Sequence, residues 1–125
     1  MTTLVLNRNA TKRRALAVVL WTLQIVSAAL FLFSGALKLT GAPMMVQMFD
    51  TIGLGQWFRY LTGGLEVISA VLLLVPSLAR FGALALAVTM VGAILTHLFI
   101  VGGNPAVPIA LLAATATIAW VRRRD

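Results

Sequence analysis

Four of the ionisable side chains in or beside the long apolar runs of this chain are of types that could do chemistry. Glu66, one of only three acidic residues, lies inside an apolar run. Lys38 and Arg59 border neighbouring runs, and the single histidine, His97, lies in another. An acidic side chain at the centre of a membrane helix costs about 2.5–3.5 kcal/mol and usually faces a bundle interior or a wet cavity. Glu66 is therefore the first candidate for a functional site.

Glu66, His97 and Lys38 are the candidate catalytic residues, because a carboxylate and an imidazole beside one substrate form a general acid–base pair. The same side chains hydrogen-bond a carbonyl or hydroxyl group of a bound molecule without any reaction. The chain has no cysteine, which excludes disulfides, thiol redox chemistry and thiolate metal sites. No metal site is predicted, and a single histidine is a weak basis for haem ligation through His97.

The composition is that of an integral membrane protein. The chain of 125 residues is 61% hydrophobic and 10% charged, whereas soluble domains carry about 25% charged residues. The net charge of +7 comes largely from basic residues clustered at the two ends, outside the apolar runs. The anionic headgroups of a lipid bilayer are therefore the predicted partner of these charges, and nucleic acid is not.

Four apolar runs predict an all-α fold, an antiparallel bundle of four transmembrane helices. The spans cover about residues 15–39, 57–75, 79–101 and 105–121, and at 1.5 Å per residue each approaches the ~30 Å hydrocarbon core. We expect one membrane domain over residues 15–121, with a basic cytoplasmic segment before it (1–14) and a basic tail after it (122–125). The first run continues well past the small residues around Ala29, which favours a retained helix over a cleaved signal peptide.

Positive charges predict the orientation. An even number of spans places both termini on one side of the membrane, and both are basic, so we expect both to be cytoplasmic in a multi-pass inner-membrane protein. This direction places Lys38, Arg59, Glu66 and His97 in the outer half of the bilayer, with Glu66 roughly 10 Å deeper than Arg59. The sequence therefore predicts a polar pocket that opens outward, with Glu66 at its floor.

Polar and small residues recur at three- and four-residue steps along each predicted helix, which is the spacing of a packing face between membrane helices. The predicted inward faces are, in order of the four spans, Gln24, Ser27, Phe31, Ser34 and Lys38; Arg59, Thr62 or Gly63, Glu66, and Ser69 or Ala70; Ala85, Thr89, Ala93 and His97; and Ala106, Ala110, Ala113 and Thr117. Three of these faces carry ionisable residues, so the predicted site lies between helices.

Each ionisable residue also has a purely structural interpretation. Glu66 paired with Lys38 or Arg59 fixes the bundle without contacting any ligand. His97 hydrogen-bonded to a neighbouring helix needs no substrate. Long basic side chains near helix ends snorkel to the headgroups; this interpretation is favoured for Arg59, whereas for Lys38 the two are balanced.

The connector between the first two spans predicts a short interfacial helix over about residues 43–51. Pro43 suits the first position of a helix, and Gly53 and Gly55 allow a tight return into the second span. The helix is rich in methionine and acts either as a lid over a lipophilic ligand or as a plug that buries the bundle end. The candidate ligand-binding residues are then Lys38, Arg59, Glu66, His97, Phe49 and Met48.

The ordered motifs resemble those of the DoxX-like family of small four-span membrane proteins over about residues 17–121. The matching segments are Phe33-Ser-Gly35-Ala-Leu-Lys38, Phe49 with Gly53-Leu54, Gly63-Gly-Leu-Glu66, Leu72-Leu-Leu-Val-Pro76, Arg80, and an Ala/Gly-rich third helix up to His97. The resemblance marks Gly35, Lys38, Gly63, Glu66 and His97 as family-like positions. It implies a bundle in the cytoplasmic membrane and an association with redox physiology, because relatives are linked to quinone-coupled sulfur oxidation and to oxidative stress.

Residues and resemblance together predict a membrane protein whose outward pocket binds a lipophilic, quinone-like molecule or supports a membrane redox subunit. The alternative is a small membrane enzyme that uses Glu66 and His97 as acid and base on a lipophilic substrate, in an isomerisation, cyclisation or epoxide opening. A transporter or proton channel is disfavoured, because four short spans leave little room for a path unless the chain forms a homo-oligomer.

Overall fold

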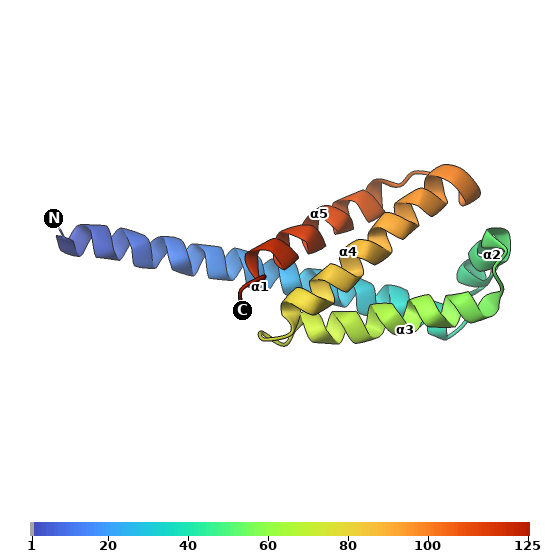
Figure 1. The fold of residues 1–125 in the computed structure, drawn as a ribbon, viewed down its shortest axis with the longest axis horizontal. Coiled ribbons are helices and arrows are strands. Elements are labelled where there is room, and N and C mark those ends of the chain that lie inside the picture. The colour runs from blue at the N-terminus through green and yellow to red at the C-terminus, as the bar shows by residue number, and fades with distance from the viewer. Residues whose placement is uncertain (1) are drawn as a thin grey trace.

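The computed structural model describes residues 2–125, and these residues form helices joined by short turns, with no strand among them (Figure 1). The elements are α1 (Thr2–Leu39), α2 (Pro43–Ile52), α3 (Gln56–Leu73), α4 (Ala79–Thr96), the π-helical turn η1 (His97–Val101) and α5 (Ala106–Val121). The all-α class predicted from the apolar runs is confirmed. The short helix predicted between the first two long helices is present as α2.

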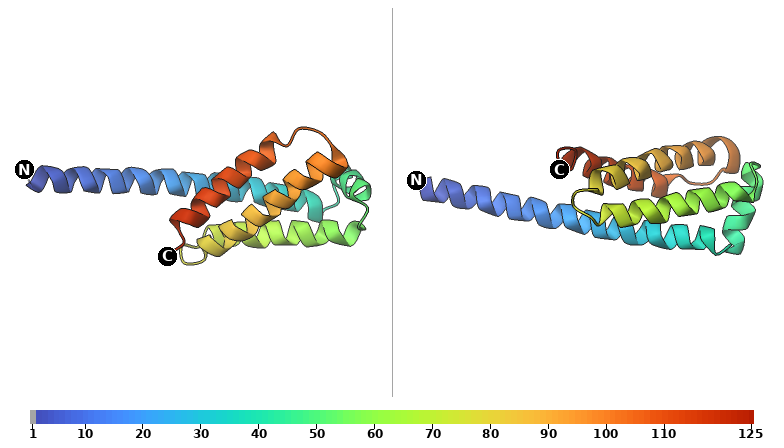
Figure 2. Two further views of the ribbon diagram at one scale, coloured as in Figure 1. Left: turned by 45° about the horizontal axis from the view of Figure 1, so that its top comes forward. Right: turned by 60° about the horizontal axis from the view of Figure 1, so that its bottom comes forward.

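The four long helices run up and down in chain order. α1 packs against α3, α3 against α4 and α4 against α5, so each long helix lies beside the next one in the sequence (Figure 2). α2 lies across one end of the bundle, where it contacts α3 and η1. The C-terminus lies at the other end, from which α1 projects (Figure 1).

α1 begins at Thr2, well before the apolar run that was predicted to start at residue 15. Residues 2–14 contain no glycine or proline, and their Leu, Ala, Lys and Arg side chains are good helix formers. The 38 residues of α1 span about 57 Å, whereas a hydrocarbon core is only ~30 Å thick. The basic N-terminal segment is therefore a helical extension that projects from the bundle with its side chains exposed.

Three glycines let neighbouring helices approach closely. A Cβ atom on Gly35 of α1 would lie 2.9 Å from the Gly63 carbonyl oxygen of α3, and one on Gly63 would lie 2.9 Å from Lys38 Cβ. On α4, a Cβ atom on Gly82 would lie 2.5 Å from the Ser69 carbonyl oxygen of α3. Backbone atoms cannot give way without moving a whole helix, so the α1–α3 and α3–α4 crossings require glycine.

Burial confirms the predicted inward faces of α1 and α3. The buried residues of these two helices include Gln24, Ser27, Phe31 and Lys38 of α1 and Arg59, Gly63, Glu66 and Ser69 of α3. The third predicted face, from Ala85 to His97, is only half-buried. α4 instead buries the adjacent face, which carries Gly82, Leu86 and Met90.

The predicted inward face of α5 is wrong. Its four members are all exposed: Ala106, Ala110, Ala113 and Thr117. Thr115 and Ile118 are buried in their place. Helices in lipid associate through van der Waals packing, and a large side chain makes many more such contacts than an alanine methyl group. Ile118 makes such contacts from the inward face, but Val107, Ile109 and Trp120 face outward, so bulk alone does not decide which face of α5 is buried.

A fully buried glutamine joins three helices at the end of the bundle opposite α2. Gln24 of α1 donates from Nε2 to the Leu73 carbonyl oxygen at the end of α3, over 2.8 Å. Its Oε1 accepts from Arg122 Nε, just after α5, over 3.1 Å. One side chain thus satisfies groups at the C-terminal ends of two other helices.

Two helical segments among the described residues are long and apolar enough to cross a membrane: Thr2–Leu39 and Ala79–Val101, each with a mean hydropathy of 2.3 over its most apolar stretch. α5 is apolar but shorter. Large apolar side chains also cover the outside of the helices, for example Phe33, Ile68 and Val88, each more than 60% exposed. Such a surface suits a lipid environment, whereas the number of spans and their orientation stay predictions.

Candidate functional site

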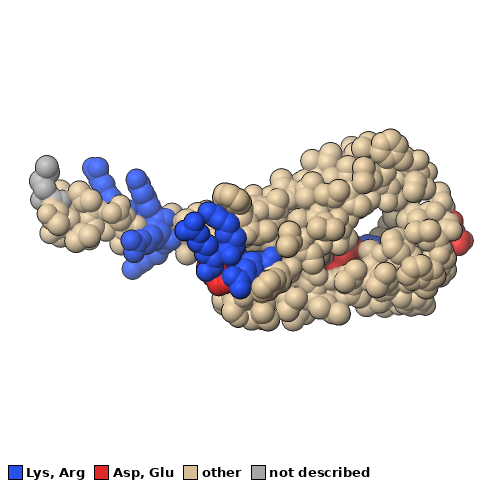
Figure 3. Space-filling model, viewed as in Figure 1, with Lys and Arg blue, Asp and Glu red and all other residues tan. Residues whose placement is uncertain are grey.

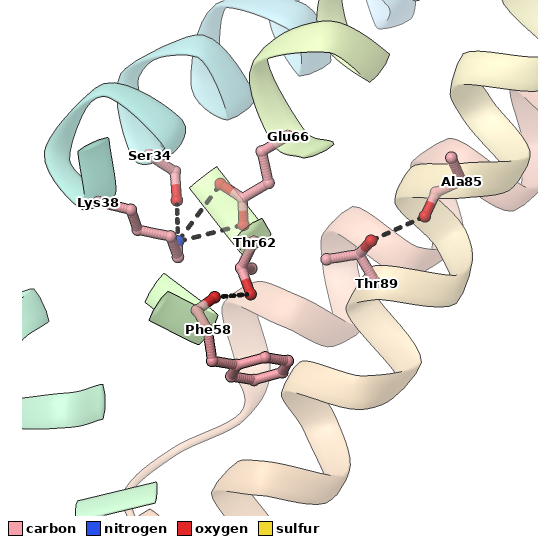
Figure 4. A network of polar contacts seen from close by, with 7 residues as sticks. All are labelled: Ser34, Lys38, Phe58, Thr62, Glu66, Ala85 and Thr89. Atoms are coloured by element: carbon pink, nitrogen blue, oxygen red, sulfur yellow. Dashed lines mark hydrogen bonds and ion pairs between the residues drawn. The ribbon is translucent and has the colours of Figure 1, made fainter. Parts of the chain in front are cut away.

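Lys38 of α1 and Glu66 of α3 form an ion pair in the interior of the bundle (Figure 4). The Lys38 Nζ atom lies 3.1 Å from Glu66 Oε1 and 3.3 Å from Oε2. The two side chains are 11% and 2% exposed, so the charges neutralise one another largely out of contact with solvent. The predicted pairing of Glu66 with a basic residue is confirmed, and Lys38 is the partner rather than Arg59.

A third contact fixes the Lys38 ammonium group. Nζ lies 2.7 Å from the Ser34 hydroxyl oxygen, one turn earlier on α1. An ammonium group has three protons and no lone pair, so Lys38 donates to Ser34 and to Glu66 Oε2, and its charge pairs with Oε1 as well. These contacts hold the ammonium inside the bundle, so it does not extend toward lipid headgroups.

The prediction that Arg59 snorkels to the headgroups is wrong. The residue is 4% exposed, and its guanidinium donates to the backbone carbonyl of Lys38 and, over 2.7 Å, to Gln56 Oε1. The Lys38 carbonyl lies in the last turn of α1, where carbonyl groups lack a partner within the helix. The Gly41 N–H donates to this oxygen over 3.4 Å, and Arg59 supplies a second donor. It holds the end of the helix that carries Lys38.

His97 lies where α4 passes into η1. Its Nδ1 atom lies 2.9 Å from the Ala93 carbonyl oxygen. A carbonyl only accepts, so Nδ1 carries the proton, and in the neutral ring Nε2 is left with a lone pair. The predicted hydrogen bond to a neighbouring helix is wrong, because this bond stays within one turn of the same helix. Within residues 2–125, no hydrogen bond joins His97 to Glu66 or Lys38.

A cavity of about 560 Å³ brings together five of the six residues predicted to bind a ligand. The predicted residues that line it are Lys38, Glu66, His97, Met48 and Phe49. Arg59 does not line it. One wall is the face of α4 that carries Thr89, Ala93 and His97, which explains why that face is only half-buried. Figure 3 shows the hollow between the helices, with acidic and basic atoms visible beside it.

α2 closes one end of this cavity. Phe49 is 4% exposed, and its ring lies 5.8 Å from the Phe58 ring of α3. Gln56 donates to a backbone carbonyl of α2 and to Asp50 Oδ1, both over 3.1 Å, and accepts from Arg59. One polar network thus joins α2, α3 and the end of α1. Sequence reasoning missed Gln56, because nothing in its spacing marks it.

The π-helical turn η1 forms the rim of the cavity at His97. The Gly102 N–H donates to the His97 carbonyl oxygen over 2.9 Å, five residues back. Such turns are rare and often occur at functional sites, where they change the direction of a side chain. The predicted third span was continuous to residue 101, and the following Gly102-Gly103 pair indicated only its end.

The cavity can form hydrogen bonds to a ligand beside the buried ion pair, and the rest of its walls are largely apolar. A few polar groups in a largely apolar cavity are typical of a small-molecule site. Within residues 2–125, no group of three or more His, Asp or Glu side chains is placed to hold a metal ion.

Comparisons with known proteins agree with the ordered motifs. A Bacillus subtilis (strain 168) protein named "Putative oxidoreductase CatD" is 30% identical over 74 residues, which make up 59% of this chain and 55% of that protein. The chain therefore spans about half the length of this relative. No solved structure gives a significant match. The model of the DoxX-like family matches residues 22–121, a stretch that includes Lys38, Glu66 and His97. The chain therefore belongs to the DoxX-like family.

Proposed function

We propose that this protein is a four-span inner-membrane protein that binds a lipophilic molecule with a polar head group in the cavity beside Lys38 and Glu66. The observation that carries the proposal is a buried ion pair on the wall of an otherwise largely apolar cavity. An ion pair that served only to join α1 and α3 would need no open space next to it. The volume of about 560 Å³ falls in the range of about 300–1,000 Å³ that small-molecule sites occupy.

The unused hydrogen-bond donors and acceptors in the cavity favour a ligand that donates hydrogen bonds. The Lys38 ammonium already contacts Ser34 and both oxygens of the Glu66 carboxylate, whereas each Glu66 oxygen keeps an unused lone pair. Thr62 and Thr89 donate to backbone carbonyls over 2.8 Å, so their hydroxyl oxygens also remain free to accept (Figure 4). Ser34 accepts from Lys38 and keeps its own proton. Acceptors thus outnumber donors, and a hydroxyl head group, as in a quinol, fits better than a quinone carbonyl.

A redox context for this binding rests on relatives. The Bacillus subtilis protein carries the name "Putative oxidoreductase CatD", and the shared region is about half of that protein. The family resemblance points the same way. A protein that holds the reduced form of a lipophilic carrier would serve a neighbouring redox subunit in the membrane.

Two glycines provide a steric test that leaves the ion pair intact. Gly92 lies on the cavity wall, and a Cβ atom there would meet nothing within 4 Å. Gly64 has the same open space but lies outside the cavity lining. Gly92→Leu therefore places a bulky side chain on the cavity lining, and Gly64→Leu is the matched control.

The test is equilibrium dialysis of the purified protein in mild detergent, without oxygen, against decylubiquinol and against decylubiquinone. We expect the wild type and Gly64→Leu to retain the quinol at least tenfold better than the quinone. Gly92→Leu should lose this retention, and Glu66→Gln should weaken it. Equal retention by all variants would show that the cavity is not the binding site. A preference for the quinone would contradict the inference that unused acceptors outnumber unused donors in the cavity.

A further inference from the structure

A groove, separate from the cavity, lies between the start of α4 and the end of α5, at the end of the bundle opposite α2. Its volume is about 440 Å³. Its walls are apolar and consist of Phe81, Leu84, Ala87, Ala116, Ala119 and Trp120. Arg80 and Arg123 complete the lining. Because α4 and α5 are antiparallel, these two arginines lie together at one end, and the small alanines extend from them toward the middle of the bundle.

The two arginines donate to backbone carbonyl groups rather than to carboxylates within residues 2–125. Arg80 Nη1 lies 3.4 Å from the Arg123 carbonyl oxygen, and Arg123 Nη1 donates to the Trp120 carbonyl oxygen over 2.6 Å. Arg80 Nε is buried and has no hydrogen-bond partner. The nearby carboxylate of Asp125 pairs with Arg122 instead, over 3.0 Å. Within residues 2–125, neither Arg80 nor Arg123 forms an ion pair with an acidic side chain.

Aromatic rings hold both guanidinium groups at the mouth of the groove. The Arg123 guanidinium carbon lies 3.9 Å from the centroid of the Trp120 ring, and that of Arg80 lies 4.7 Å from the centroid of the Phe81 ring. Cation–π contacts of this kind orient a guanidinium and leave its edge free for an anion. A ligand that matches the groove therefore needs an anionic head and an apolar tail.

We propose that this groove binds one anionic phospholipid. Its phosphate lies between Arg80 and Arg123, where planar guanidinium groups form paired hydrogen bonds to phosphate oxygens. One acyl chain lies along Ala87, Ala116 and Ala119, whose small side chains leave room for it. From Arg80 to Ala87 the groove runs about 10 Å along α4. The predicted cytoplasmic position of this end would place the groove in a leaflet that carries anionic lipids.

The groove can be tested independently of the quinol cavity. Purified, delipidated protein is titrated with phosphatidylglycerol or with phosphatidylcholine of the same acyl chains, and bound lipid is counted by native mass spectrometry. We expect one phosphatidylglycerol to bind at least tenfold more tightly than phosphatidylcholine. Arg123→Gln and Arg80→Gln should each weaken that binding about tenfold. Arg124→Gln removes the same charge from the same tail outside the groove and should leave it unchanged.

A steric variant separates a lipid site from a site for phosphate alone. Ala119→Leu narrows the apolar part of the groove without changing its charge, so phosphatidylglycerol binding should fall, whereas binding of inorganic phosphate would not. Equal losses in Arg123→Gln and Arg124→Gln would overturn the proposal in favour of diffuse charge attraction. Unchanged lipid binding by Ala119→Leu would overturn the acyl groove. Arg123 and Ala119 lie at the surface or half-buried, so these variants keep the test valid even if Arg80→Gln does not fold.

Discussion

The buried pair of Lys38 and Glu66 predicts a specific pattern of destabilisation when its members are replaced singly or together. Lys38→Met keeps a long unbranched side chain but removes the charge, and it leaves a carboxylate that is 2% exposed without its cation. At a separation of 3.1 Å and an effective dielectric constant of about 20, the attraction between the charges is about 5 kcal/mol. Removing one partner of a buried pair costs about 3–5 kcal/mol, and we expect Lys38→Met to lower the free energy of unfolding by this amount.

The double variant Lys38→Met/Glu66→Gln should recover most of the loss, because it leaves no buried ion without a partner. Lys12→Met is the matched control, since Lys12 lies on the exposed extension of α1, and we expect it to change stability by less than about 0.5 kcal/mol. The free energy of unfolding is measured by titrating detergent micelles with sodium dodecyl sulfate and following helicity. The reasoning is refuted if Lys38→Met behaves like Lys12→Met, or if the double variant is no more stable than Lys38→Met.

Three further substitutions test how the bundle is held. Gly82→Ala forces a Cβ atom to 2.5 Å from a backbone oxygen of α3 and should lower stability by about 1–3 kcal/mol in a thermal melt. Gly64→Ala is its control, because a Cβ atom there meets nothing within 4 Å. We expect Gly64→Ala to be neutral or stabilising by up to about 1 kcal/mol. Arg59→Gln removes the side-chain donor to the Lys38 carbonyl and leaves the Gly41 N–H at 3.4 Å, so amide hydrogen exchange at the end of α1 should accelerate, by about tenfold or more. Gln24→Leu removes both hydrogen bonds of the side chain that joins α1, α3 and the end of α5, and exchange at the C-terminal end of α5 should accelerate in the same way.

Polar residues in apolar runs made the inward faces of α1 and α3 predictable. A polar side chain in lipid must find a partner, so its position in the sequence indicates the direction of the bundle interior. Alanine gives no such indication, because it is tolerated in lipid and in a packed interface alike. The face of α5 from Ala106 to Thr117 was therefore misassigned. Bulk would not have served better, because Ile118 is buried whereas Val107, Ile109 and Trp120 are exposed.

The cavity residues followed from the sequence, but their contacts did not. Lys38, Glu66 and His97 could be placed at similar depths by counting residues along helices. The role of Arg59 depended on the position of the Lys38 carbonyl at the end of α1, 21 residues away in sequence. The π-helical turn at His97 is likewise a departure from regular geometry that no residue spacing encodes. Side chains that serve backbone groups of another helix are visible only once the helices are assembled.

The geometry at Glu66 favours a binding role over the acid–base role that the residue types also suggested. A general base loses its negative charge when it takes up a proton, and here the carboxylate lies 3.1 and 3.3 Å from the Lys38 ammonium. Glu66 protonated by a substrate would lose its attraction for Lys38, whose ammonium would then lie charged inside the bundle. His97 is tied to its own helix through Nδ1. A ligand hydroxyl, by contrast, reaches the remaining lone pairs of Glu66 while the ion pair stays intact, so binding requires no change in the charges that hold α1 to α3.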